Sequence, residues 1–187
     1  MVRLFSALEL PDPVRAELAQ RLHVLREQDA EPGELRWVPA ERWHITLGFY
    51  GDREHVDRRG AWFRRQAAGL GAARLRLRGA GRFPGVLWVG VSPMDSADAT
   101  ALRTLAGALN ADRNTSDYDF TAHVTVARWR RGATGSRSAI QAVQGLADYQ
   151  GSWWHAGEVV LFRSDQAGGA GPVYTALARV PLASRPG

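Results

Sequence analysis

The sequence predicts an α+β fold of two pseudo-symmetric lobes, each with a mainly antiparallel sheet and helices, and an active-site cleft between them. Residues 73–79 alternate arginine and leucine, the pattern of an antiparallel strand with one wet face. The order strand, helix, strand carrying a His-x-Thr motif, helix, strand also occurs twice. This recurrence indicates that residues 1–187 form a single domain of two similar lobes, with approximate repeat units 1–82 and 83–187.

In the first repeat unit, hydrophobic periodicity separates strands from helices. Asp12 and Pro13 mark the start of the first helix, as an N-cap residue and a proline at the first helical position. Apolar residues at helical spacing continue it, whereas alternation of period two marks the strands. The expected elements are a strand at 3–10, a helix at 12–25, strands at 35–38 and 43–49, a helix at 54–70 and a strand at 73–79.

The order of elements starts again after residues 81–85, a segment that contains glycine and proline. The last two strands of the second repeat unit are separated by a glycine-rich, flexible connection at 167–171. The expected elements are a strand at 86–91, a helix at 97–111, a strand at 120–129, a helix at 138–147 and strands at 153–163 and 173–182.

Composition excludes several classes of chemistry. The chain has no cysteine, so disulfides, thiol nucleophiles and cysteine-ligated zinc are ruled out. It also has no lysine, which rules out a ligase with a lysine nucleophile and an ordinary P-loop. The net charge of +5 favours phosphate-bearing partners. Without an apolar run of about 18 residues or a signal peptide, we expect no membrane partner and a cytoplasmic location.

The two His-x-Thr segments carry the strongest functional signal. Side chains alternate across a strand, so His44 and Thr46 project from one face, and His123 and Thr125 project together from another strand. An imidazole transfers protons near neutral pH, and a threonine hydroxyl can hydrogen-bond a phosphate oxygen. Two histidines so far apart in the chain, with no nearby cysteine or carboxylate cluster, make a poor zinc site. We therefore expect neither a metal nor a cofactor.

The remaining histidines and several aromatic residues receive weaker assignments. We interpret the histidines outside the motifs as surface or structural residues; they are His23, His55 and His155. Four aromatic residues are candidates to flank the cleft, where a base could stack on them; they are Phe5, Trp37, Trp43 and Phe83.

The motif segments WHITLGFYG (43–51) and AHVTVAR (122–128) resemble the two HxTx motifs of the two-histidine phosphoesterase superfamily. The closest resemblance is to its RNA 2′,3′-cyclic phosphodiesterase branch, also called the bacterial 2′-5′ RNA ligase family. Further segments similar to that family extend over essentially the whole chain, at 3–11, 35–47, 81–91 and 171–182. Gly48 stands where the family often has a larger residue.

This resemblance implies a mechanism. His44 would be the proton donor and His123 the proton acceptor in the hydrolysis of 2′,3′-cyclic phosphate ends of RNA to 2′-phosphomonoesters, without a metal. Run backward, the reaction would join RNA ends through a 2′-5′ linkage without ATP. Thr46 and Thr125 are the first candidates to bind the phosphate. Arg128 matches an arginine of the second motif, but on an ideal strand it faces away from His123, so its contact with phosphate requires a bulge or the strand end.

Two other functions fit the same residues. One is the same chemistry on a small cyclic nucleotide or an ADP-ribose derivative. The other is a non-catalytic module that binds RNA ends. The partners expected are thus RNA ends, such as tRNA-type fragments, or cyclic nucleotides, and the chain is expected to be a monomer.

Overall fold

The computed structural model describes residues 3–29, 33–51, 55–110, 120–130, 137–166 and 171–184. Within these ranges it contains four α-helices, one short 3-10 helix and a sheet of nine strands. The elements are β1 (Arg3–Glu9), α1 (Asp12–Glu27), β2 (Arg36–Trp37), η1 (Ala40–Arg42), β3 (His44–Phe49), α2 (Val56–Ala67), β4 (Ala73–Phe83), β5 (Val86–Pro93), α3 (Ser96–Leu109), β6 (His123–Arg128), α4 (Arg137–Gly145), β7 (Trp154–Ala156), β8 (Glu158–Gln166) and β9 (Pro172–Pro181).

The sheet has two halves of four strands that meet in the middle. The strand order is β7-β4-β5-β6-β3-β1-β8-β9, and β2 pairs with the outer end of β6. All pairings between these strands are antiparallel. The halves join where β3 and β6 pair through Ile45 and Val124. The α+β prediction is confirmed, and the two antiparallel halves form one continuous sheet.

Each half of the sheet combines strands from both predicted repeat units. β8, from the C-terminal part, pairs with β1 at the N-terminus, whereas β4 pairs with β5 in the other half. The recurring order of elements is visible as β1-α1-β3-α2-β4 followed by β5-α3-β6-α4-β8. The last strand of each series therefore pairs with the first strand of the other, so neither series contains a complete half of the sheet.

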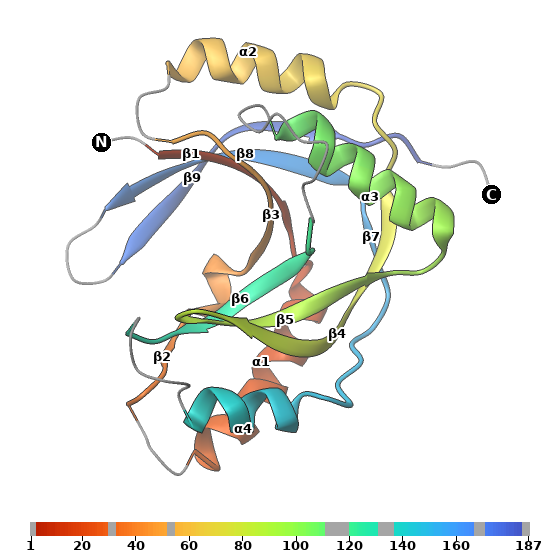
Figure 1. Ribbon diagram of the computed structural model, residues 1–187. Coiled ribbons are helices and arrows are strands. Elements are labelled where there is room, and N and C mark those ends of the chain that lie inside the picture. The colour runs from red at the N-terminus through yellow and green to blue at the C-terminus, as the bar shows by residue number, and fades with distance from the viewer. Residues whose placement is uncertain are drawn as a thin grey trace.

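Helices lie above and below the sheet (Figure 1). α2 lies against β8 and β9, α3 packs against strands of both halves (β3, β4 and β5), and α1 and α4 lie under β4, β5 and β6. The apolar faces of the strands and helices form one main core, to which β3 contributes Ile45 and Leu47 and β6 contributes Val124 and Val126. The sheet faces that carry the two histidines are left uncovered by these helices. None of the helices in the described ranges is both long and apolar enough to cross a membrane.

Several predicted strand boundaries were wrong, and two of these errors concern the pairing of the sheet. β4 continues to Phe83, beyond its predicted end at residue 79. Gly79 adopts a left-handed φ of +59°, and the resulting bulge lets the pairing with β5 resume at Ala80. The predicted strand 153–163 is divided into β7 and β8, which belong to opposite halves of the sheet and are separated by Gly157.

Candidate active site

The two His-x-Thr segments lie on the adjacent central strands β3 and β6. Because Ile45 is paired with Val124 in an antiparallel register, His44 is placed opposite Thr125, and Thr46 opposite His123. All four side chains therefore project from the same face. His44 and His123 are diagonal neighbours in this arrangement, a relation that places residues about 7–8 Å apart. A single phosphate group fits between two rings at such a separation.

Both imidazole rings are held in the same way. Nδ1 of His44 lies 2.7 Å from the carbonyl oxygen of Arg42, and Nδ1 of His123 lies 2.7 Å from the carbonyl oxygen of Thr121. A carbonyl oxygen can only accept a hydrogen bond, so each Nδ1 carries the hydrogen. The Nε2 atom is thus the position at which each ring can take or give a proton. In each case the carbonyl belongs to the residue two positions before the histidine.

The four motif side chains line one open cavity of about 610 Å³. Residues from β1, β2, η1 and β9 complete its walls and add arginines and aromatic rings. The lining residues are Arg3, Phe5, Arg36, Trp37, Val38, Pro39, Arg42, His44, Thr46, Phe49, His123, Thr125, Arg128, Ser164, Gln166, Gly171, Pro172 and Tyr174.

A β-bulge brings Arg128 to the cavity. β5 pairs Leu87 with Ala127 and the next residue with Thr125, so Val126 is the extra residue of the bulge. Val126 and Ala127 are consequently both buried, and Arg128 returns to the face that carries His123. A bulge, one of the two conditions that the sequence interpretation gave for Arg128, is therefore present at this position.

The first motif contains the equivalent bulge. β1 pairs Ser6 with Gly48 and the next residue with Thr46, which makes Leu47 the extra residue. The first motif ends in Phe49 at the same offset from its histidine as Arg128 in the second. Both side chains line the cavity, so the cavity has an aromatic ring at one end of the motif pair and a cation at the other.

The surroundings of His44 have opposing effects on its pKa. Loss of hydration on burial lowers the pKa of His44, as do the nearby charges of His123 and Arg128. The hydrogen bond to the Arg42 carbonyl and the charge of Glu9 raise it. In the free protein the net effect favours the neutral ring. An anionic phosphate bound between the histidines would act in the same direction as Glu9 and would favour the protonated ring.

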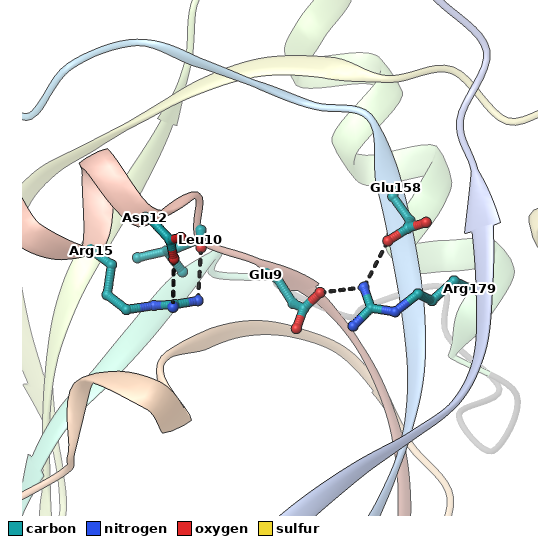
Figure 2. A network of polar contacts seen from close by, with 6 residues as sticks. All are labelled: Glu9, Leu10, Asp12, Arg15, Glu158 and Arg179. Atoms are coloured by element: carbon teal, nitrogen blue, oxygen red, sulfur yellow. Dashed lines mark hydrogen bonds and ion pairs between the residues drawn. The ribbon is translucent and has the colours of Figure 1, made fainter.

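Glu9 belongs to an ion-pair network beside His44. Glu9 and His44 are directly paired residues of β1 and β3, so their side chains share a face. Arg179 of β9 donates to Glu9 at 2.5 Å and to Glu158 of β8 at 2.7 Å. Figure 2 shows Arg179 between these two carboxylates. The network therefore holds the Glu9 carboxylate in place.

Tyr174 of β9 is a cavity residue that sequence reasoning did not find. Its ring meets the edge of the His44 ring, with centroids 5.4 Å apart, and it also contacts Phe5. Burial raises the pKa of Tyr174, while Arg128 and Arg42 act in the opposite direction. The hydroxyl therefore stays protonated at neutral pH and is available as a hydrogen-bond donor in the cavity.

The aromatic predictions have mixed outcomes. Phe5 packs against His44 with centroids 4.8 Å apart, and Trp37 lines the cavity. Phe83 meets the edge of the His123 ring at 5.3 Å and is 39% exposed. Trp43 is 3% exposed and its indole nitrogen donates to the Val38 carbonyl, so the prediction that it flanks the cleft was wrong. The histidines outside the motifs are exposed; they are His23, His55 and His155.

Within the described residues, no group of three or more histidine or acidic side chains is arranged to hold a metal ion. The donor-bearing side chains that line the cavity include imidazoles, hydroxyls and guanidinium groups. Guanidinium groups and hydroxyls bind phosphate oxygens, so the arrangement can hold a phosphate and transfer protons on two sides of it.

Comparison with known proteins identifies the family of the chain. The profile of the 2′-5′ RNA ligase superfamily matches residues 10–168. The chain belongs to this superfamily. No curated protein matches the chain.

Solved structures show the same fold as this 2′-5′ RNA ligase superfamily chain. The protein TT0787 of Thermus thermophilus is similar with a TM-score of 0.69 and 27% identity, over 96% of this chain and 97% of that one. E. coli LigT in complex with 3′-AMP is similar with a TM-score of 0.69 and 24% identity, over 96% of this chain and 97% of that one. A protein described as a phosphoesterase is similar with a TM-score of 0.65 and 22% identity, over 97% of this chain and 99% of that one.

Several cavity residues of this superfamily chain were not identified from the sequence. Phe49 could have been found, because it occupies in the first motif the offset that Arg128 occupies in the second. Arg42 could also have been found, because it lies two residues before His44, at the end of η1. Sheet pairing alone brings three further residues to the cavity; they are Arg3, Arg36 and Tyr174.

Proposed function

We propose that this chain hydrolyses 2′,3′-cyclic phosphate ends of RNA to 2′-phosphomonoesters by acid–base catalysis with two histidines. The observation that supports it most directly is the placement of His44 and His123. They are diagonal neighbours on one face of the β3–β6 pair, each with Nδ1 bonded to a carbonyl and Nε2 left for proton transfer. Membership of the 2′-5′ RNA ligase superfamily supports the same class of reaction.

The proposed step is an in-line displacement at phosphorus. Nε2 of His123 takes a proton from water as the water oxygen forms a bond to phosphorus. The bond from phosphorus to the 3′ oxygen breaks, and Nε2 of His44 gives its proton to that oxygen. The phosphate stays on the 2′ oxygen. Exchange of protons with solvent then returns His44 to the protonated form and His123 to the neutral form.

The donors around the cavity suit the charge that develops at phosphorus. The non-bridging oxygens become more negative in the transition state, and positioned donors stabilise them. Thr46 and Thr125 are nearest to the histidines in the register, and Arg128 reaches the same face through its bulge. Tyr174 adds a protonated hydroxyl. The reverse reaction with a 5′-hydroxyl RNA end would use the same groups to form a 2′-5′ linkage without ATP.

The test is an end-group assay on an RNA oligonucleotide that carries a 2′,3′-cyclic phosphate. We expect the wild-type chain to convert it to a 2′-phosphate end, identified by ³¹P NMR or by its resistance to a 3′-phosphatase. A 3′-phosphate product would contradict the assigned leaving group. Binding without turnover would indicate an RNA-end-binding module. Turnover confined to 2′,3′-cyclic mononucleotides or a cyclic ADP-ribose phosphate would indicate a small-molecule phosphodiesterase.

A further inference from the structure

Two arginines of the cavity lie directly opposite each other. Arg36 of β2 is paired with Arg128 of β6, so both side chains leave the same face from Cβ atoms about 4.5–5.5 Å apart. Both are exposed and both line the cavity. Among the described residues, neither forms an ion pair with a carboxylate. Like charges directly opposite each other destabilise a sheet, and an anion bound between them would remove that cost.

The cavity carries more positive charge than one cyclic phosphate requires. A 2′,3′-cyclic phosphodiester has a single negative charge. The cavity walls nevertheless contain four arginines, and the lining residues that the structure describes include no aspartate or glutamate. The arginines come from β1, β2, η1 and β6; they are Arg3, Arg36, Arg42 and Arg128.

The opposed arginines lie farther along β6 than the two motif residues. Arg128 is still close enough to His44 for its charge to lower the pKa of that ring. Along β6, Arg128 is three residues beyond Thr125, which corresponds to about 10 Å or less at the rise of a strand. Arg36 faces Arg128 from β2, so it lies at the same level along β6, displaced from the motif threonines.

We propose that Arg36, which faces Arg128 across the β2–β6 pair, binds a second phosphate of the substrate, one nucleotide away from the phosphate held between His44 and His123. This inference rests on the proposed function and names the substrate class within it. The substrate is an RNA end with an internucleotide phosphate on the 5′ side of the terminal nucleotide. A cyclic mononucleotide occupies only the site between the histidines.

The experiment removes the charge of the second phosphate and the charge of Arg36 separately and together, as in a double-mutant cycle. Three substrates are compared by kcat/KM. They are the dinucleotide ApA ending in a 2′,3′-cyclic phosphate, the same dinucleotide with an uncharged methylphosphonate linkage, and 2′,3′-cyclic AMP. The proteins are wild type, Arg36→Gln, Arg36→Lys and, as a matched control, Arg103→Gln. Arg103 is an exposed arginine of α3 outside the cavity.

The wild type is expected to prefer the charged dinucleotide to the uncharged one by at least about tenfold, the typical effect of a hydrogen bond to a charged group. Arg36→Gln abolishes this preference but keeps turnover of 2′,3′-cyclic AMP within about twofold. Arg36→Lys retains part of the preference, and Arg103→Gln retains all of it. The dependence of log kcat/KM on log salt concentration for the charged dinucleotide becomes shallower by about 0.7 in Arg36→Gln, as expected for one lost contact to a single strand.

Equal kcat/KM for the charged and uncharged dinucleotides in the wild type would overturn the proposal, and this result does not depend on the folding of any variant. An undiminished preference in Arg36→Gln would overturn it as well. Failure of the proposed function gives a different result, since the wild type would then open none of the three cyclic phosphates.

Discussion

Glu9 lies directly opposite His44 across β1 and β3, with its carboxylate held by Arg179. Because the register of β1 and β3 places Glu9 beside His44, the charge of Glu9 affects the protonation of the proposed proton donor. Other charged or titratable groups also face or contact His44: His123 and Arg128 on β6, and Tyr174 on β9. Glu9 is the group among them whose charge raises the pKa of His44.

Glu9→Gln is therefore expected to shift the pH dependence of activity. A proton donor must be protonated, so activity is lost as the pH rises through the pKa of His44. Removing the negative charge of Glu9 lowers that pKa, and the alkaline limb of the kcat/KM profile moves to lower pH. Arg179→Gln removes the compensating positive charge and moves the same limb to higher pH. Profiles for both variants check this, and equal shifts in one direction would contradict it.

Loss of either motif histidine should abolish most catalysis. His44→Ala and His123→Ala are each expected to lower kcat by about 10²–10⁴-fold, the usual contribution of one proton-transfer group. The double variant should fall little further, because the two groups act in one step. The exposed His23 provides the control, since His23→Ala removes an imidazole on α1 away from the cavity. Single-turnover rates on a cyclic-phosphate oligonucleotide measure these effects. A variant with wild-type kcat would remove that histidine from the mechanism.

The motif threonines are expected to act through their hydroxyl groups. Thr46→Val and Thr125→Val keep the side-chain shape and should lower kcat/KM by about tenfold or more each, as for a lost hydrogen bond to a charged group. Thr46 is exposed and Thr125 is partly exposed, so the thermal unfolding midpoint should change little. Serine substitutions keep the hydroxyl and should retain most activity. Valine variants as active as the serine variants would contradict this role.

Chelators should leave the reaction unaffected. The proposed chemistry uses imidazoles for proton transfer and guanidinium and hydroxyl groups for charge stabilisation, and these are the groups present in the described lining of the cavity. Activity measured after dialysis against EDTA should equal that of the untreated protein. A loss that zinc restores would assign the histidines to metal binding instead.

Gly48 should be required for stability. A Cβ atom at this position would lie 2.0 Å from the backbone oxygen of Leu109 and 2.9 Å from the Tyr50 hydroxyl, which itself donates to that oxygen at 2.8 Å. Gly48→Ala is therefore expected to lower the free energy of unfolding by about 1–3 kcal/mol or more.

Gly107 in α3 serves as the matched control for Gly48. A Cβ atom added at Gly107 would meet no atom of a neighbouring element within 4 Å. Gly107→Ala should therefore raise the free energy of unfolding by about 0.5–1 kcal/mol through helix propensity. Urea denaturation compares the two variants. A Gly48→Ala protein as stable as the wild type would show that α3 can move away from β3.

The sequence by itself determined the order of elements and the orientation of the motif side chains. Alternation along a strand is a local property, so it places His44 with Thr46 and His123 with Thr125 without knowledge of the partners. The resemblance of the two motif segments to a known family then suggested their chemistry.

Only the tertiary structure decided how the two motifs meet and what surrounds them. The pairing of Ile45 with Val124 makes the histidines diagonal neighbours, and the bulge at Val126 reverses the alternation so that Arg128 joins them. Arg36 enters the cavity through the pairing of β2 with the distant β6, and Tyr174 enters it because the β8–β9 hairpin pairs with β1 at the other end of the chain. Such pairings depend on the whole sheet, and a bulge changes the face of every residue after it, so local periodicity does not predict either of them.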